Sequence, residues 1–142
     1  MFMKRSHFFS ILFTVYFLYP FPGFTQKLSI DDLIERDGIY YEVFDDNPFN
    51  GRVEGILNGQ IINGKWEGVW THFYKNGPLG SRINYKKGKK DGSFETYHEN
   101  GQLLSRGTYV NGVLNGIMKI YDIRGQLKAQ RFFKQGIQSY QK

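Results

Sequence analysis

The chain has 142 residues, a length that favours a single domain. Its 13 Phe, 10 Tyr and 17 Gly favour strands and tight turns over helices, and the only alanine is Ala129. With no cysteine, disulfides, thiolate metal sites and cysteine nucleophiles are excluded, and the formal net charge is +6.

Residues 1–25 have the pattern of a secretory signal peptide. Lys4 and Arg5 precede an almost wholly apolar run over 8–19, and Pro20 then interrupts the run. This run of 12 residues is shorter than the roughly 20 that a membrane-spanning helix needs. The sequence therefore predicts an exported protein, periplasmic or extracellular, with an uncleaved membrane anchor as the alternative.

Residues 26–67 are expected to form an N-terminal cap with a short helix and a degenerate repeat. The spacing predicts a helix over 29–36, with Ser29 as its N-cap and acidic residues near its positive end. The acidic residues of this stretch could also suggest a calcium or catalytic site, but we favour the structural interpretation. They are Asp31, Asp32, Glu35 and Asp37.

Three blocks of 24 residues, 68–91, 92–115 and 116–139, align without a gap. Seven columns keep glycine, leucine or a large apolar residue at constant spacing. The structural repeat residues that we single out are Trp70, Phe73, Gly77, Tyr85, Gly88, Phe94, Tyr97, Gly101, Tyr109, Gly112, Tyr121, Gly125, Phe133 and Gly136. Residues 68–142 are thus expected to hold three repeats and a C-terminal tail.

Each block predicts a β-hairpin. Asn76-Gly77 and Asn100-Gly101 are typical of two-residue type I′ turns, in which both central residues have positive φ. A second, looser turn is expected at Gly88 and its equivalents. The predicted fold is all-β: an elongated, twisted antiparallel meander of stacked hairpins. We expect each aromatic column to be buried against the same column of the neighbouring unit.

These residues resemble the MORN repeat in its bacterial variant. The best copy is 92–116, which keeps the Tyr-x-x-Asn-Gly-Gln-Leu run from Tyr97 to Leu103. The third block departs from the pattern, with Arg124 at the turn asparagine and Phe133 at the tyrosine, and we expect the fold to survive both changes. The resemblance implies an elongated sheet and a role in protein interaction, dimerisation or membrane-proximal assembly. It also implies an alternative role, as an antitoxin or immunity-type inhibitor of a toxin protein.

No motif for catalysis, phosphate binding or metal binding is present. There is no G-x-S-x-G elbow and no phosphate loop, and His72 and His98 occupy different repeat columns. A hairpin ladder also spreads its polar groups over a surface, whereas catalysis needs them to converge in a concave site. We expect a protein that is not an enzyme, with no cofactor, metal or catalytic residue.

Charge is divided unevenly along the chain. Residues 26–67 hold four basic and nine acidic residues, whereas 68–142 hold 13 basic and four acidic ones. Such asymmetry can mark a surface for anionic partners, although exposed lysines can also simply keep strand edges from associating. The candidate binding face is Arg82, Lys86, Lys87, Lys89, Lys90 and Arg106.

The sequence thus favours an exported binding or scaffold module. Its expected partner is a protein or an anionic lipid or glycan of the cell envelope, and export argues against nucleic acid. Pairing of exposed edge strands would allow a homodimer.

Overall fold

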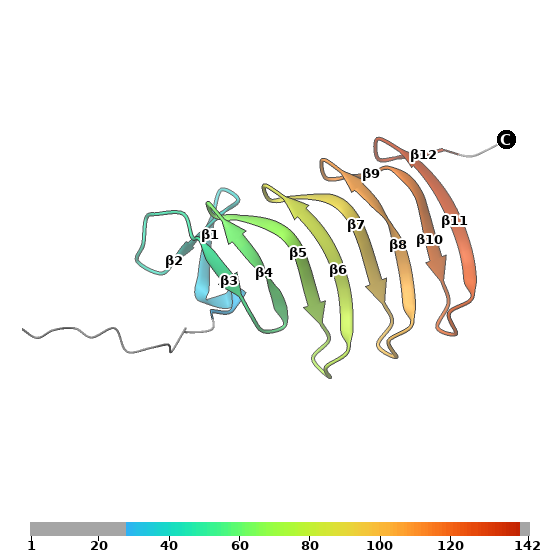
Figure 1. The fold of residues 1–142 in the computed structure, drawn as a ribbon, viewed down its shortest axis with the longest axis horizontal. Coiled ribbons are helices and arrows are strands. Elements are labelled where there is room, and N and C mark those ends of the chain that lie inside the picture. Colours follow the sequence, from blue (N-terminus) through green and yellow to red (C-terminus); the bar gives the residue numbers. More distant parts are fainter. Residues whose placement is uncertain (1–27, 140–142) are drawn as a thin grey trace, which may run out of the picture.

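The computed structural model describes residues 28–139, which form an antiparallel meander (Figure 1). A ten-stranded sheet runs in the order β12-β11-β10-β8-β7-β6-β5-β4-β3, with β9 paired to β8, and β1 and β2 form a separate hairpin. The predicted all-β ladder of stacked hairpins is confirmed. The strands are β1 Leu33–Arg36, β2 Ile39–Glu42, β3 Gly51–Val53, β4 Leu57–Ile62, β5 Lys65–Phe73, β6 Leu79–Lys86, β7 Lys89–Tyr97, β8 Leu103–Val110, β9 Val113–Leu114, β10 Gly116–Tyr121, β11 Leu127–Lys134 and β12 Ile137–Ser139.

The N-terminal helix is shorter than predicted. It is one 3-10 turn, Ile30–Asp32, and residues 33–36 are strand β1. The cause is the Asp37-Gly38 pair, in which both residues have positive φ (53° and 75°) and close a type I′ turn onto β2. Across residues 28–139 no helix has the length and apolar character to cross a membrane. The predicted signal segment lies outside the described residues.

The type I′ turns and the looser turns lie at the opposite ends of the hairpins from those predicted. At Asn76-Gly77 only the glycine has positive φ, 107°. The amide of Gly77 donates to the Tyr74 carbonyl, and the amide of Tyr74 donates to the Pro78 carbonyl. These two bonds close a three-residue loop. The asparagine position therefore needs no positive φ, and Arg124 occupies it in the third repeat with the same pair of hydrogen bonds.

Type I′ turns lie instead at the other end of each hairpin. Lys87 (φ 51°) and Gly88 (φ 81°) form one of them, and Asn111-Gly112 and Gln135-Gly136 repeat it. Lys87 and Gln135 are not typical of the first turn position, but Asn111-Gly112 is an Asn-Gly pair, so the type I′ signal was present in the sequence at one of these turns. The expectation of type I′ turns at Asn76-Gly77 and Asn100-Gly101 is therefore wrong, although the hairpins themselves are present.

The first glycine of each block forms a bulge, inside β5 and β7 and at the start of β10. Between β6 and β7 the register runs from Ile83↔Phe94 to Tyr85↔Lys90, so β7 contains two extra residues around Gly92. Gly92 has φ 107°, and its equivalents Gly68 and Gly116 also have positive φ. This bulge explains why glycine recurs at the position, since other residues are strained there.

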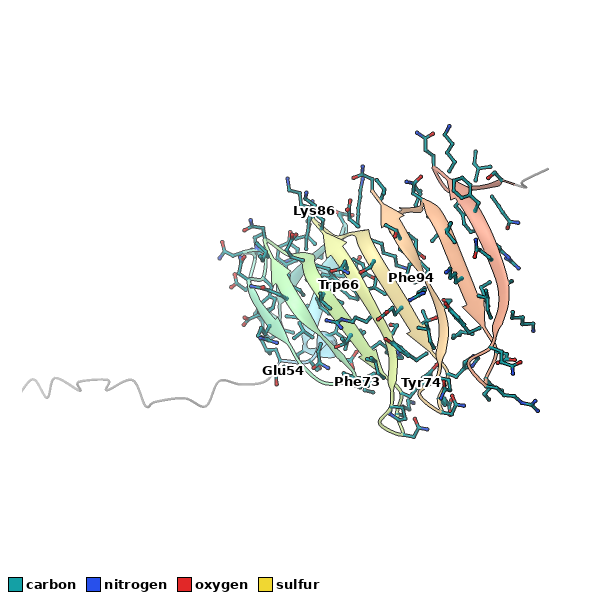
Figure 2. All side chains as sticks on the ribbon, turned by 45° about the vertical axis from the view of Figure 1, so that its right-hand side comes forward. Glu54, Trp66, Phe73, Tyr74, Lys86 and Phe94 are labelled. Atoms are coloured by element: carbon teal, nitrogen blue, oxygen red, sulfur yellow. The ribbon has the colours of Figure 1, made fainter. Side chains whose placement is uncertain are left out.

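The core is concentrated at the N-terminal end, on the sheet face covered by the β1–β2 hairpin, which we call the inner face. Trp70 is 2% exposed and lies parallel to Trp66, with ring centroids 3.8 Å apart. Figure 2 shows Trp66 and Phe94 along the sheet. The buried apolar side chains are Leu33, Phe49, Val53, Ile61, Trp70 and Phe94.

The aromatic columns do not stack on themselves as we had expected. Trp70 and Phe94 are equivalent residues two strands apart, about 10 Å, and Ile83 of β6 lies between them. The ring contact of Phe94 is instead with Tyr109, from another column, at 4.9 Å. The columns therefore interdigitate across strands.

Hydrogen bonds join each repeat to the next at the type I′ turns. The amide of Lys87 donates to the Glu67 carboxylate at 2.8 Å, and the amide of Gly88 donates to the Trp66 carbonyl at 2.9 Å. The next repeat has the same arrangement, with the Asn111 amide donating to Asp91 at 3.1 Å. In the third the acceptor is Asn115, at 3.4 Å from the Gln135 amide. We call this arrangement the turn clamp.

Removing one clamp should weaken the ladder measurably. We expect Asp91→Ala to lower the free energy of unfolding by about 1 kcal/mol, because the Asn111 amide loses its carboxylate acceptor. Asn115→Ala is the matched control, with a longer bond to a neutral acceptor, and should cost less. Urea unfolding would measure both, and a cost for Asn115→Ala equal to or above that for Asp91→Ala would contradict the turn clamp.

Candidate binding face

The sheet face opposite the core, which we call the outer face, carries a row of charged residues across successive strands. Strand pairing places Arg82 beside Glu95, Glu95 beside Arg106, and Arg106 beside Lys119. We call these four residues the basic ladder. Neighbouring strands are about 4.8 Å apart, so the ladder presents three cations and one carboxylate in a line perpendicular to the strands.

The single carboxylate of the ladder is held by a neighbouring tyrosine. The Tyr97 hydroxyl donates to Glu95 Oε2 at 2.8 Å. Partial burial raises the pKa of Tyr97, and the bond to Glu95 and the charge of Glu95 raise it further, so the hydroxyl remains a donor at neutral pH. Within residues 28–139, Arg82, Arg106 and Lys119 form no hydrogen bond or ion pair. These cations are therefore available to an external anion.

A shallow depression of about 260 Å³ lies beside Arg106 and Lys119. It forms where the sheet is least continuous, because β8 and β10 pair through only two residue pairs beyond the Gly116 bulge. Gly107 pairs with Phe94, and a Cβ atom there would point to the inner face, 2.8 Å from the Phe94 ring, so Gly107 borders the depression through its backbone. The lining residues are Ser93, Phe94, Glu95, Arg106, Gly107, Thr108, Ile117 and Lys119. The depression thus combines two cations and one carboxylate with two hydroxyl groups.

The structure divides the six predicted binding residues among different surfaces. Arg82 and Arg106 lie in the basic ladder. Lys86 and Lys89 occupy opposed positions on β6 and β7, on the outer face and next to the turn that joins these strands. Figure 2 shows Lys86 at the opposite end of the sheet from Phe73 and Tyr74. Lys87 lies at the turn tip.

Lys90 lies on the inner face, beside Tyr85. Its Nζ is 5.2 Å from the centroid of the Tyr109 ring, a cation–π contact. Lys90 is thus separated by the thickness of the sheet from the four candidate residues that lie on the outer face.

Sequence reasoning missed Lys119. Its repeat column contains Thr71 and Glu95, so no charge recurs in it. Only the strand register, which includes the bulge at Gly116, brings Lys119 next to Arg106. The alternation of side chains along β10 predicts which face of the sheet Lys119 lies on, but it does not predict which residue lies beside it.

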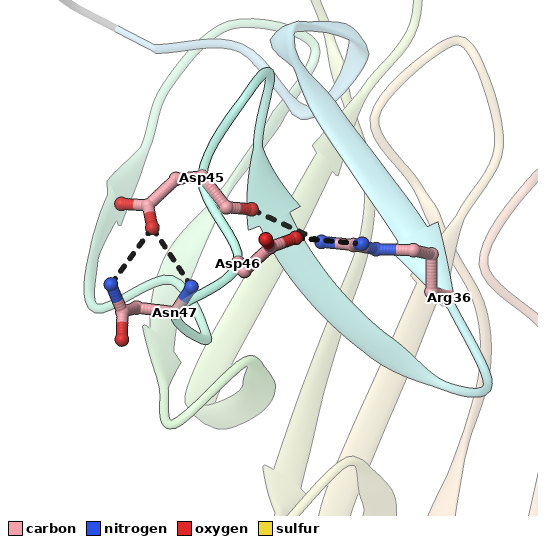
Figure 3. Close-up of polar contacts among 4 residues, drawn as sticks. All are labelled: Arg36, Asp45, Asp46 and Asn47. Atoms are coloured by element: carbon pink, nitrogen blue, oxygen red, sulfur yellow. Dashed lines mark hydrogen bonds and ion pairs between the residues drawn. The ribbon is translucent and has the colours of Figure 1, made fainter.

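The acidic N-terminal stretch is used in local structure. The Asp32 carboxylate accepts from the Ser29 amide at 2.7 Å, and this bond lowers the pKa of Asp32. Asp46 pairs with Arg36 at 3.1 Å (Figure 3). Asp45 accepts from the backbone and side chain of Asn47, and the backbone bond is the main reason that its pKa is lowered. No three metal-ligating side chains gather anywhere in the described part of the chain.

The two histidines among residues 28–139, His72 and His98, occupy separate places. The His72 ring lies edge-on to Tyr74, with centroids 6.0 Å apart. His98 Nε2 lies 3.3 Å from the Tyr121 carbonyl oxygen of the following repeat. Each ring thus packs beside its own neighbours.

Comparison with known proteins gives one family. The profile described as the MORN repeat variant matches residues 66–87 and again 90–111, which correspond to the β5–β6 and β7–β8 hairpins. No curated protein and no solved structure matches the chain. The two matches fall on consecutive hairpins with the same bulge and the same turns, and they identify these hairpins of the chain as MORN repeats.

Proposed function

We propose that this MORN-repeat protein is an exported, non-catalytic binding and scaffold module. Its basic ladder binds an anionic group of a protein partner or of the cell-envelope surface. Export is proposed from the sequence of residues 1–25, and the absence of catalysis from the open arrangement of polar groups on the sheet. The observation that carries the binding proposal is that Arg82, Arg106 and Lys119 have no hydrogen-bond or ion-pair partner among the described residues.

Two features support the ladder over the turn lysines as the centre of the binding face. The cations of the ladder project from paired strands, which fix their spacing, whereas Lys87 lies on a turn. The depression beside Arg106 and Lys119 also lets an anion approach both cations and the hydroxyls of Ser93 and Thr108 together. Sites on rigid elements hold their geometry better than sites on loops.

Charge reversal tests the proposal. The variant Arg106→Glu/Lys119→Glu is compared with Lys75→Glu/Arg124→Glu, which makes the same change in net charge at two exposed turn positions. Each is applied to a dextran sulfate column and eluted with a salt gradient. We expect the ladder variant to elute at much lower salt than the control, because screened surface charge acts mainly at short range.

The result that would contradict the proposal is equal elution of the two variants, since net charge alone would then explain retention. Circular dichroism should show the same sheet content in both, because all four substituted side chains project from the surface or line an open depression. Vesicles with anionic lipid and an acidic polypeptide, assayed with the same variants, would distinguish an envelope surface from a protein partner.

A further inference from the structure

A second depression, of about 220 Å³, lies on the inner face where the N-terminal hairpin meets the repeats. It is separated from the basic ladder by the sheet. Its lining comes from β1, β2, β5, β6 and the two type I′ turns that follow β1 and β6. The lining residues are Glu35, Gly38, Tyr40, Trp66, Tyr85 and Gly88. We call it the cap pocket.

Three aromatic rings form the walls of the cap pocket. Trp66 packs against Tyr40, with centroids 6.2 Å apart and planes at 28°, and against Tyr85 at 4.9 Å, edge-on. Trp70 supports Trp66 from behind at 3.8 Å. The faces of such rings carry partial negative charge. Because the rings are braced by the core, their positions are fixed before any ligand arrives.

The charge of the cap pocket comes from one carboxylate. Glu35 is exposed and lies opposite Tyr40 in the β1–β2 hairpin. Desolvation raises the pKa of Tyr40, and the nearby Glu35 charge raises it further. Desolvation also raises the pKa of Tyr85, so both phenols are neutral at neutral pH.

The basic residues nearest in sequence point elsewhere. Arg36 lies over the Tyr41 ring at 4.0 Å and pairs with Asp46. Lys86 and Lys89 lie on the outer face, and Lys90 lies over Tyr109. Lys65, which precedes Trp66, lies beside Gly88 but outside the lining, so within residues 28–139 no lysine or arginine lines the pocket.

We propose that the cap pocket binds an organic cation, an alkylammonium group of about the size of trimethylammonium. A cation placed against aromatic faces and beside a carboxylate gains both cation–π and charge–charge attraction. An anion would meet Glu35 and the negative ring faces, and a neutral group would gain only apolar contact. This inference does not rest on the basic ladder or on the function proposed for it.

Choline and its uncharged isostere 3,3-dimethylbutan-1-ol provide the test, with the full chain as receptor. Calorimetry measures binding, and tryptophan fluorescence gives a second readout, because Trp66 lines the pocket and Trp70 lies against it. We expect choline to bind saturably and the isostere to bind about tenfold more weakly or worse, because it lacks the charge. Equal binding of the two, or no saturable binding of choline, would overturn the proposal.

Two variants locate the site. Glu35→Gln keeps the size of an exposed side chain and should weaken choline binding by about fivefold. Asp37→Asn is the matched control, since Asp37 is an exposed acid two positions away that does not line the pocket. It should leave binding unchanged, and equal losses in the two variants would show that only general charge matters.

A further comparison distinguishes a cation on a polypeptide side chain from a free amine. A short peptide that contains trimethyllysine is titrated beside choline. Tighter binding of the peptide would assign the pocket to a polypeptide side chain, and equal binding would assign it to a free amine. Binding of the ligands should not change in the variant Arg106→Glu/Lys119→Glu, which separates this site from the outer face.

Discussion

Replacing Gly59 with alanine should lower the free energy of unfolding by about 3 kcal/mol. Gly59 is buried on β4, and a Cβ atom there would lie 2.2 Å from Cδ2 of Trp70. Trp70 cannot move away, because it is 2% exposed, stacked on Trp66, and bound through Nε1 to the Gln60 carbonyl at 3.2 Å. Either the indole stack or strand β4 must shift to accept one methyl group.

Gly80→Ala is the matched control. A Cβ at Gly80 would also make a close contact, 2.8 Å from His72 Nδ1, but His72 is a partly exposed side chain that can rotate. We expect a cost below about 1 kcal/mol. Neither glycine has positive φ, so backbone strain does not enter the comparison. Urea unfolding of both variants gives the measurement, and similar midpoints would show that the indole stack is not rigid.

The second large effect should appear at Trp70 itself. Trp70→Ala is expected to cost about 3–5 kcal/mol, the usual range for loss of a buried aromatic side chain. Met118→Ala, at the same position of the third repeat, should cost only about 1 kcal/mol, because Met118 is partly exposed and lies beyond the part of the sheet that the N-terminal hairpin covers.

Denaturant unfolding followed by tryptophan fluorescence is unsuited to a variant that lacks Trp70, so circular dichroism should monitor both proteins. A comparable loss in the two variants would mean that stability is shared evenly along the ladder. The burial pattern predicts a steep gradient, since the buried apolar cluster is made of Leu33, Phe49, Val53, Ile61 and Trp70.

The repeat period was enough to predict the ladder, because hairpins of equal length must pair in succession. It was not enough to predict turn types. An Asn-Gly pair suits both a two-residue loop and a three-residue loop, and the choice depends on the strand register, which the bulge at Gly92 alters by two residues. The same shift decides which side chains face each other, which is why Lys119 was missed.

The cap pocket could not be predicted from the sequence for a different reason. Its carboxylate and its central indole are far apart in sequence, and Glu35 was expected on a helix. The strand that replaces that helix turns Glu35 and Tyr40 to the same side of the hairpin, because paired residues of a sheet share a face. Local propensity could not anticipate this packing against the first repeat.

The turn clamp gives the protein a direction. The backbone amides of Lys87 and Asn111 donate to carboxylates that come earlier in the chain. In the clamp, the acceptor always precedes the donor. Shortening the chain from its C-terminal end therefore leaves the clamps of the remaining type I′ turns in place. Loss of the hairpin that contains Glu67 would leave the Lys87 amide of the next type I′ turn without its carboxylate acceptor. A growing polypeptide would meet its acceptors already in place, so the ladder can be completed in the order in which it is synthesised.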